Sequence, residues 1–377
     1  MPLLEDLKRL ARLPRTTSPF FTLYLNTRWD GEKQRERVRI FVKTRLKECL
    51  VETAKRGGVQ PPAVQDDVDK VSHYVRGLVN REWDEDYAGV AVFACGALGV
   101  YRVVRSHLPF SDYLGCSDRP LLRPAAEHAH TGKGGLVALV AADAGQVLEF
   151  ELGSVCKQFS FRDEEFPGRH DQGGWSQGRY QRHVDEHLHR NLKRLAEHLV
   201  RWADEGGTET VLLSGQDALL SAFEQHLPKR ILARVGTPLH LDPTASAAAI
   251  LTHALDAMAG VRAARDRAAV DDLLDRSAGP GRAVVGPTAV ADAVASGKVH
   301  QLYLDEGFRE MGWKCFGCGA LGVKVPLGCP GCGAPAEGVD LGEELVRGTL
   351  ATDGTVVAVT GVDGLQREGG VGARLRY

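Results

Sequence analysis

Residues 173–182 read Gly-Gly-Trp-Ser-Gln-Gly-Arg-Tyr-Gln-Arg, and this stretch indicates the fold more clearly than any other part of the chain. Two adjacent glycines allow backbone conformations that other residues avoid, and they let a partner approach closely. Arg179 and Arg182 can pair with phosphate through forked hydrogen bonds, and Gln177 offers both a donor and an acceptor. We interpret the stretch as a loop that reaches into a nucleic-acid site.

A long amphipathic helix is expected directly after this loop, from residue 182 to the glycine pair at 206–207. Its apolar stripe consists of Val184, Leu188, Leu192, Leu195, Leu199 and Trp202. Its opposite face carries His183, His187, Arg190, Lys193 and Arg194. These polar residues could form a simple solvated face. Because they follow the loop, we assign Lys193 and Arg194 to RNA binding.

The loop and helix resemble the central domain of the archaeo-eukaryotic peptide release factor and Pelota superfamily, particularly its bacterial members. In its release factors, a Gly-Gly-Gln tip enters the peptidyl-transferase centre and helps water cleave the ester of peptidyl-tRNA. Gly173 and Gly174 match the glycines of that tip, but Trp175 occupies the place of the glutamine. Gln177 lies two positions later and could replace it only in a rebuilt loop. The resemblance thus implies catalysis by Gly173, Gly174 and Gln177.

Further matches follow the family order along the last two-thirds of the chain. Residues 211–215 resemble a buried strand of the central domain, and residues 284–304 resemble the opening of the third domain. The closing segment 369–377 resembles the glycine-rich final strand of many Pelota-type chains. The resemblance implies that Trp175, Ser176, Arg179 and Arg182 contact RNA. It also implies that the third domain meets a translational GTPase or another factor.

Two CxxC pairs, separated by ten residues, predict a metal centre. They contribute Cys315, Cys318, Cys329 and Cys332, and each pair is followed by a glycine. This spacing is typical of a zinc ribbon, in which four thiolates hold one structural Zn²⁺ and leave no open position for catalysis. An iron–sulfur cluster with the same ligands and redox-active thiols are the alternatives. A metal-binding insertion at a comparable place in archaeal release factors agrees with zinc.

The composition is that of an ordinary globular protein of 377 residues, with 43% hydrophobic and 25% charged residues and a net charge of -2. The other cysteines are scattered, which favours a reducing cytoplasm over a disulfide framework. The N-terminal leucines follow helical spacing, and we expect neither a secretion signal nor a membrane span. We therefore expect a cytoplasmic protein with no membrane partner and no DNA partner.

Residues 28–56 form a basic segment, with ten Lys and Arg residues against five acidic ones. Apolar residues recur at helical intervals, so one face of a helix should pack while the other is basic. We predict that Arg35, Arg39 and Lys43 contact ribosomal RNA, because cations on a helix displace counterions from phosphates. A surface on which the charges pair with neighbouring acids is an equal alternative.

We predict an α/β multidomain protein. Residues 1–129 should form an α+β N-terminal domain, with strands near 18–26, 87–93 and 99–105. The segment 109–124 and the turn at 131–135 should separate it from the next domain. Residues 130–262 should form an RNase H-like central domain, and residues 263–377 an α/β/α third domain with a zinc-ribbon insertion at 313–336. The only carboxylates near the central strands are Asp143, Glu149 and Glu151. A nuclease needs carboxylates that converge on a metal, so this activity is disfavoured.

Three functions remain open. The first is a codon-independent ribosomal A-site factor that hydrolyses peptidyl-tRNA; the stop-codon motifs of decoding release factors, Asn-Ile-Lys-Ser and the Tyr-Cys motif, are absent from the sequence. The second is a non-catalytic A-site occupant for ribosome rescue or hibernation, as in the Balon-type relatives, with Trp175 stacking on a nucleotide. The third is an RNA-binding module not tied to the ribosome. We favour the first, because a glutamine is kept at the tip.

Overall fold

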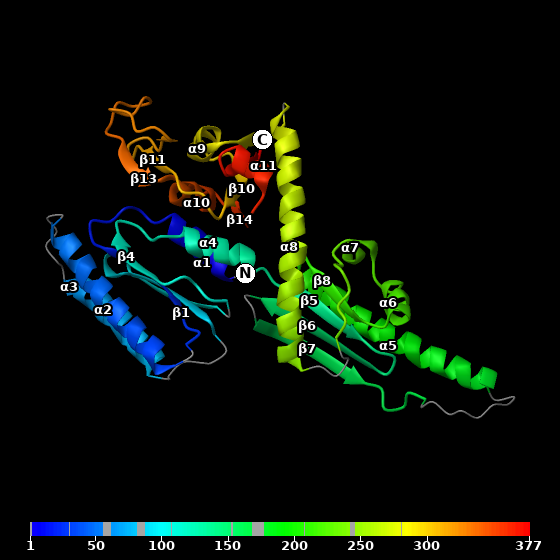
Figure 1. Cartoon of the computed structure of the whole chain (residues 1–377). Coiled ribbons are helices and arrows are strands. Elements are labelled where there is room, and N and C mark those ends of the chain that lie inside the picture. The colour runs from blue at the N-terminus through cyan, green and yellow to red at the C-terminus, as the bar shows by residue number, and fades with distance from the viewer. Residues whose placement is uncertain are drawn as a thin grey trace. The chain divides into compact units, whose positions relative to one another are not determined.

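The computed structural model describes residues 2–29, 31–55, 62–80, 87–106, 108–151, 154–167, 177–206, 208–241, 246–279 and 281–377. The chain divides into two compact units (Figure 1). Unit 1 contains residues 1–131 and 265–377, and unit 2 contains residues 132–264. Strands and helices alternate in both, so the α/β multidomain class predicted from the sequence is confirmed.

Unit 1 begins with helix α1 (Pro2–Ala11) and an antiparallel sheet of order β3-β2-β1-β4. Its strands are β1 (Phe20–Asn26), β2 (Gly89–Cys95), β3 (Val100–Ser106) and β4 (Tyr113–Ser117). A short 3₁₀ helix, η1 (Gly96–Leu98), joins β2 to β3. Side chains of β1 alternate between the two faces, as the pleat requires. Both faces are covered, which explains why β1 and β2 are buried along almost their whole length.

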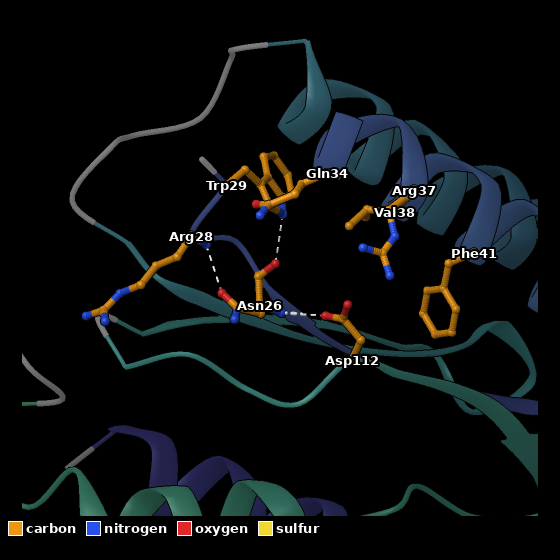
Figure 2. Close-up of a pocket in the computed structure, with 8 residues that line it drawn as sticks. All are labelled: Asn26, Arg28, Trp29, Gln34, Arg37, Val38, Phe41 and Asp112. Atoms are coloured by element: carbon orange, nitrogen blue, oxygen red, sulfur yellow. Dashed lines mark hydrogen bonds between the residues drawn. The ribbon is translucent and has the colours of Figure 1, made fainter. Parts of the chain in front are cut away.

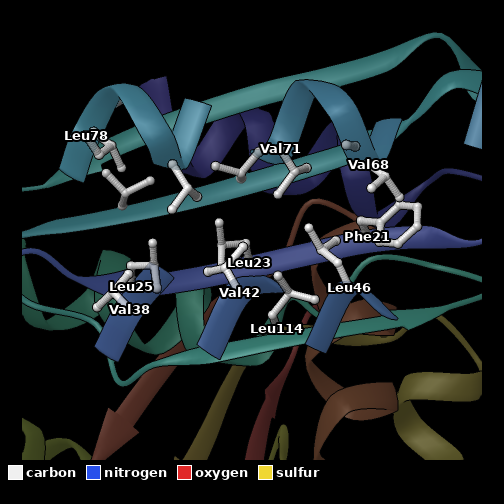
Figure 3. Close-up of a cluster of buried hydrophobic side chains, with 14 of the residues drawn as sticks. Phe21, Leu23, Leu25, Val38, Val42, Leu46, Val68, Val71, Leu78 and Leu114 are labelled. Carbon is white, nitrogen blue, oxygen red and sulfur yellow. The ribbon is translucent and has the colours of Figure 1, made fainter. Parts of the chain in front are cut away.

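Helices α2 (Glu32–Lys55) and α3 (Pro62–Val79) cover one face of this sheet (Figure 3). Phe21, Leu23 and Leu25 of β1 pack there against Val38 and Val42 of α2. On the other face, the Tyr24 hydroxyl donates to the Leu121 carbonyl oxygen at 2.7 Å, close to the start of α4 (Arg123–Thr131). The sheet therefore holds α2 rigidly by its apolar side.

The part of the predicted linker within residues 109–124 is wrong, whereas the turn predicted at 131–135 lies at the boundary between the two units. Strand β4 lies in this segment and pairs with β1 from Phe20↔Ser117 to Tyr24↔Tyr113. The prolines that suggested a linker, Pro109, Pro120 and Pro124, stand outside the strand. Because proline only terminates an element, its presence on both sides did not exclude a strand between.

The C-terminal part of unit 1 contains a four-stranded sheet of order β14-β10-β15-β9. Its strands are β9 (Ala283–Val285), β10 (Val299–Asp305), β14 (Thr355–Val359) and β15 (Val371–Leu375). Its helices are α9 (Pro287–Ala295), α10 (Leu341–Ala351) and α11 (Asp363–Arg367). Strands β10 and β14 run parallel, and β15 runs antiparallel to β10. Gly369 and Gly370, with φ of +85° and +75°, form the turn that leads into β15.

Between β10 and α10 lies a small separate sheet of order β12-β11-β13. Its strands are β11 (Met311–Lys314), β12 (Leu321–Gly322) and β13 (Glu337–Asp340). This insertion carries the four cysteines of the CxxC pairs. Its position agrees with the predicted zinc-ribbon insertion.

Unit 2 is built on a sheet of order β7-β6-β5-β8. Strands β5 (Gly135–Val140), β6 (Ala144–Glu151) and β7 (Ser154–Arg162) form an antiparallel meander, and β8 (Val211–Gly215) runs parallel to β5. This is the arrangement expected of the RNase H-like central domain. The sequence interpretation missed β7, since the half-exposed strand alternates apolar and polar residues only in its second half.

Helix α5 (Gln177–Glu205) packs on one face of this sheet, with α6 (Asp217–Glu224) and α7 (Lys229–Leu232) beside it. On the other face, Ile250, Ala254 and Met258 of α8 (Ala247–Ser277) pack against β5 and β6. Among the described helices, none combines the length and apolarity that spanning a bilayer requires.

Candidate functional site

Helix α5 begins at Gln177, so the predicted start at residue 182 is wrong and residues 177–182 of the predicted loop are the first turns of the helix. Its 29 residues correspond to a rod about 43 Å long at 1.5 Å per residue. Leu192, Leu195 and Leu199 are buried against the sheet, whereas the first buried side chain described in this helix is His187. Figure 1 shows the N-terminal end of α5 extending past the strands of its own unit. The amphipathic helix predicted from the sequence is therefore long, and its first turns make little contact with the core of unit 2. We call α5 the stem.

The predicted catalytic residues lie at or before the start of this helix. Gly173, Gly174, Trp175 and Ser176 lie outside the described residues. Gln177 is the first residue of α5 and Arg179 lies in its first turn, but their side chains are also outside the described part. The catalytic assignment consequently stays a prediction.

A polar cluster fixes the outer part of α5 to the end of β7. The Asp163 carboxylate accepts from His187 Nδ1 at 2.8 Å, from Asn191 Nδ2 at 3.0 Å and from Arg190 at 3.4 Å. The hydrogen bond from His187 lowers the pKa of Asp163 to about 2. His187 and Asn191 are buried. We call Asp163, His187, Arg190 and Asn191 the arm anchor.

Sequence reasoning placed His187 and Arg190 on a polar helix face and missed the arm anchor. Asp163 is 24 residues from His187 along the chain, and the packing of α5 against the sheet brings the two side chains together. The sequence offered one signal. His187 and Asn191 lie four residues apart on the helix face that we expected to be exposed to solvent.

Arg182, Lys193 and Arg194 are exposed on α5, and their contact with RNA stays a prediction. The Arg194 guanidinium lies over two aromatic rings of β7, 4.6 Å from the centroid of Phe161 and 5.5 Å from that of Phe159. The rings hold the flat guanidinium in place, so its N–H donors are oriented before a partner arrives.

The three basic residues predicted on the N-terminal helix follow one another at four-residue intervals on α2, and so share a face. Arg39 donates to Glu36 at 2.6 Å and to Asn80 at 3.3 Å, while Arg35 lies 5.7 Å from the Trp29 ring centroid. Lys43 is exposed. The paired-surface alternative thus describes Arg39 but not Lys43.

The four cysteines of the insertion converge on one point. All four Sγ atoms lie within 4.8 Å of one another. The Cys315–Cys332 and Cys318–Cys329 sulfur distances are both 3.5 Å. Four sulfurs at such distances are a tetrahedral ligand set for a closed metal site. The predicted ligands are therefore brought together, and they fit a metal ion.

Two equivalent turns present these sulfurs. Gly319 N donates to Cys315 O and Gly333 N donates to Cys329 O, each at 2.8 Å. Gly319 and Gly333 have φ of +82° and +76°, a conformation that favours glycine, so both glycines are required by the turns. Donation from the Cys318 backbone amide lowers the pKa of Cys315 to about 6, which favours the thiolate that a metal binds.

A buried ion cluster at the base of the insertion was not predicted. Glu344 of α10 accepts from Lys314 of β11 and from Arg119, each at 2.6 Å, and only 3% of its side chain is exposed. Glu343 accepts from the backbone amides of Leu122 and Arg123 at 2.9 and 2.8 Å. Except for the Lys314–Glu344 pair, these contacts join residues more than 200 positions apart, which no local sequence pattern can indicate.

The central unit matches a known family. Residues 120–259 match the model of "Bacterial archaeo-eukaryotic release factor family 10". Over these residues the chain is similar to bacterial members of the archaeo-eukaryotic release factor superfamily. The matched residues include all of β5 to β8, the arm anchor and helix α5. The resemblance inferred from the loop and its helix is confirmed.

Solved structures of the superfamily are similar to this release-factor-like chain only at low identity. Archaeal translation termination factor aRF1 is 15% identical, with 100% of this chain and 96% of that chain covered and a TM-score of 0.25. Archaeoglobus fulgidus Pelota is 14% identical (77% and 79% covered, TM-score 0.35), and S. cerevisiae Dom34 is 10% identical (76% and 81%, TM-score 0.39). No curated protein matches the chain. The family match alone carries the assignment.

Proposed function

We propose that this protein is a codon-independent translation factor that occupies the A site of the ribosome and hydrolyses peptidyl-tRNA. The observation that carries the proposal is helix α5, which belongs to a release-factor family domain and begins at Gln177. The arm anchor holds α5 ten residues from that end, through His187. This stem supports delivery of residues 173–182 into a site on the ribosome.

In the proposed reaction, Gln177 orients a water molecule toward the ester carbonyl of peptidyl-tRNA. An amide has no pKa useful for proton transfer, so its contribution would be to position the nucleophile. Gly173 and Gly174 would allow close approach, and Ser176, Arg179 and Arg182 would hold RNA phosphates. Lys193 and Arg194 on α5, with Arg35, Arg39 and Lys43 on α2, would add contacts to tRNA and rRNA.

A non-catalytic role in ribosome rescue or hibernation is the second candidate. Trp175 favours it, because an aromatic ring stands where the family glutamine is expected and can stack on a nucleotide. In that role residues 173–182 and helix α5 would occupy the A site without cleaving the ester. An RNA-binding module not tied to the ribosome is the remaining alternative.

We further propose Zn²⁺ as the structural metal of Cys315, Cys318, Cys329 and Cys332, since four thiolates in a closed set select zinc or an iron–sulfur cluster. The three-domain division at residues 129 and 262 is also retained as a proposal. By resemblance, the third domain would bind a translational GTPase or another factor. Such a protein would act in the cytoplasm, where its cysteines stay reduced.

The test is release of peptide from ribosome-bound peptidyl-tRNA by the wild type, Gln177→Ala and Gln181→Ala. Gln181 lies one turn further along α5, and its side-chain amide donates to Asp185 Oδ1 at 3.0 Å, so it is a matched control. Hydrolysis predicts release that Gln177→Ala reduces at least about 100-fold, the loss typical of a removed positioning group, and that Gln181→Ala preserves.

Each other result selects a different function. Binding to the A site without release by the wild type favours the rescue or hibernation role. Release that is equal in wild type and Gln177→Ala removes Gln177 from the mechanism. Failure to co-sediment with ribosomes at low salt, where phosphate contacts are strongest, discards both ribosomal functions.

A further inference from the structure

A pocket of about 580 Å³ lies at the end of β1 in unit 1. This volume is in the range of small-molecule sites. The floor is formed by Asn26 and Asp112, and α2 contributes Arg37, Val38 and Phe41, as Figure 2 shows. Trp29 and Gln34 stand at one side, and the Arg28 side chain extends away from Arg37. The pocket uses none of the residues assigned to the proposed function.

The lining is held in place by hydrogen bonds to one residue. The backbone amide of Asn26 donates to Asp112 Oδ1 at 2.7 Å, and its side-chain oxygen accepts from Arg28 N at 2.9 Å. Trp29 Nε1 donates to the Asn26 carbonyl oxygen at 2.9 Å. These bonds orient the carboxylate, the amide and the indole without a ligand, so binding would cost little ordering.

The same bonds leave several polar groups ready for a ligand. Within the described part of the chain, the Asn26 side-chain NH₂ has no acceptor and the second oxygen of Asp112 has no donor. Arg37 is exposed and makes no hydrogen bond or ion pair with any described residue. The pocket thus presents a donor, an acceptor and a cation beside two aromatic rings.

This combination selects one class of ligand. Trp29, Phe41 and Val38 offer an apolar, aromatic surface that suits a flat ring. Arg37 suits a phosphate, but the nearby Asp112 carboxylate would repel a purely anionic ligand such as an acidic peptide. A flat ligand that carries an N–H donor for Asp112 as well as a negative charge for Arg37 satisfies both residues and the aromatic surface. The amino groups of adenine, cytosine and guanine are such donors, and uracil lacks one.

We propose that this pocket binds a single nucleotide with an amino-bearing base. The base lies against the aromatic residues, Asp112 accepts from its amino group, the Asn26 amide donates to a ring acceptor, and Arg37 binds the phosphate. The nucleotide is either free or an unstacked residue of an RNA strand, because both present the same chemistry. The inference does not depend on ribosome binding or on hydrolysis.

The experiment is calorimetric titration of the full chain with AMP, CMP, UMP and a single-stranded cytidine pentanucleotide. CMP should bind at least about 5-fold more tightly than UMP, as expected for one lost hydrogen bond. Arg37→Gln should weaken CMP about 10-fold, the effect of a charge-assisted bond. Arg102→Gln, which changes an exposed arginine of β3 outside the pocket, should leave affinity unchanged.

Asp112→Asn gives the sharpest test. The asparagine oxygen can still accept from Asn26 N, while its NH₂ replaces an acceptor by a donor and so matches the O4 acceptor of uracil. The CMP preference should therefore fall or reverse in this variant, which a merely structural role of Asp112 would not produce. Circular dichroism checks that the variant is folded.

The two sources separate in the same titrations. A pentanucleotide that binds at least about 100-fold more tightly than CMP, and that Arg37→Gln also weakens, identifies an RNA strand; equal affinities identify a free nucleotide. The proposal is overturned if no compound saturates the protein below about 10 mM. Equal effects of Arg37→Gln and Arg102→Gln, or an unchanged base preference in folded Asp112→Asn, overturn it as well.

Discussion

The stem, helix α5, and the four-cysteine insertion each carry one of the two sequence motifs of this protein, but they are stabilised by opposite means. Helix α5 packs into a core of 15 buried residues in unit 2. The buried cluster of the insertion holds only three residues, Trp313, Cys315 and Cys329. So small a core cannot offset the entropy of ordering the chain. The difference teaches that the stem depends on apolar packing, whereas the insertion needs another source of stability, for which its four converging cysteines offer a metal site.

The largest expected effect is the loss of the metal from the insertion. Cys315→Ser should release the ion and unfold residues 311–340, because structural zinc contributes about 10–16 kcal/mol in isolated zinc-finger peptides. Metal analysis and hydrogen exchange of the full chain measure both outcomes. The protection of the α5 backbone amides against hydrogen exchange should stay unchanged.

Cys156→Ser is the control for this prediction, since Cys156 is an exposed cysteine of β7 outside the cluster. It should keep about one equivalent of metal. If Cys315→Ser also retained the metal, or if chelation left the insertion protected, the contrast with the stem would be removed.

The next effect concerns the core beneath the stem. Leu199→Ala should lower the free energy of unfolding of unit 2 by about 2–5 kcal/mol, because Leu199 is fully buried and the change leaves a cavity. Denaturant dependence of hydrogen exchange in α5 reports the loss. Glu197 is exposed on the same helix, and Glu197→Ala should change the free energy of unfolding by less than about 0.5 kcal/mol. Equal losses would show that α5 does not depend on its apolar face.

A smaller effect is expected at the arm anchor. Asp163→Asn should cost about 1–2 kcal/mol and loosen the outer turns of α5, because it removes a charge-assisted hydrogen-bond acceptor. The folded pKa of Asp163, about 2, is below its usual value near 3.9. The stabilisation is therefore complete above about pH 4 and is lost as the pH falls toward 2.

Hydrogen exchange of the outer turns of α5 at pH 6 and pH 3 checks this prediction in wild type and Asp163→Asn. The difference between the two proteins should shrink at the lower pH. A difference that is the same at both values would exclude the ionised carboxylate as the cause.

The smallest effect is expected on the surface of α2. Lys43→Gln should leave stability within about 0.5 kcal/mol of wild type. If α2 binds RNA, it should also lower the salt dependence of RNA binding by about one unit of slope. Affinity measured between 50 and 200 mM salt gives the slope. An unchanged slope favours the alternative of a solvated, paired surface.

Much of the fold could be predicted from the sequence, because local patterns determine most of its elements. The 3.6-residue repeat from Val184 to Trp202 predicted α5, and the apolar run at residues 20–25 predicted β1. Strand β4 and strand β7 were missed. Both lie at sheet edges, where fewer apolar side chains are required and the strand pattern is weak.

The candidate sites also divide into those that the sequence predicted and those that it did not. The CxxC spacing determined the metal ligands by itself, because two short turns bring each pair of sulfurs together whatever surrounds them. The glycine-rich loop and its helix likewise indicated the family whose model matches residues 120–259. These motifs are local, so their chemistry can be read from neighbouring residues.

Only the tertiary structure determined the arm anchor, the Glu344 ion cluster and the pocket beside Trp29. Asp163 meets His187, Arg119 meets Glu344, and Asn26 meets Asp112 through strand pairing and helix packing over separations of 24 to 225 residues. Such contacts arise when burial removes water and leaves each polar group to find a partner in the fold. The sequence therefore determined which chemical groups the protein has, and folding determined which of them act together.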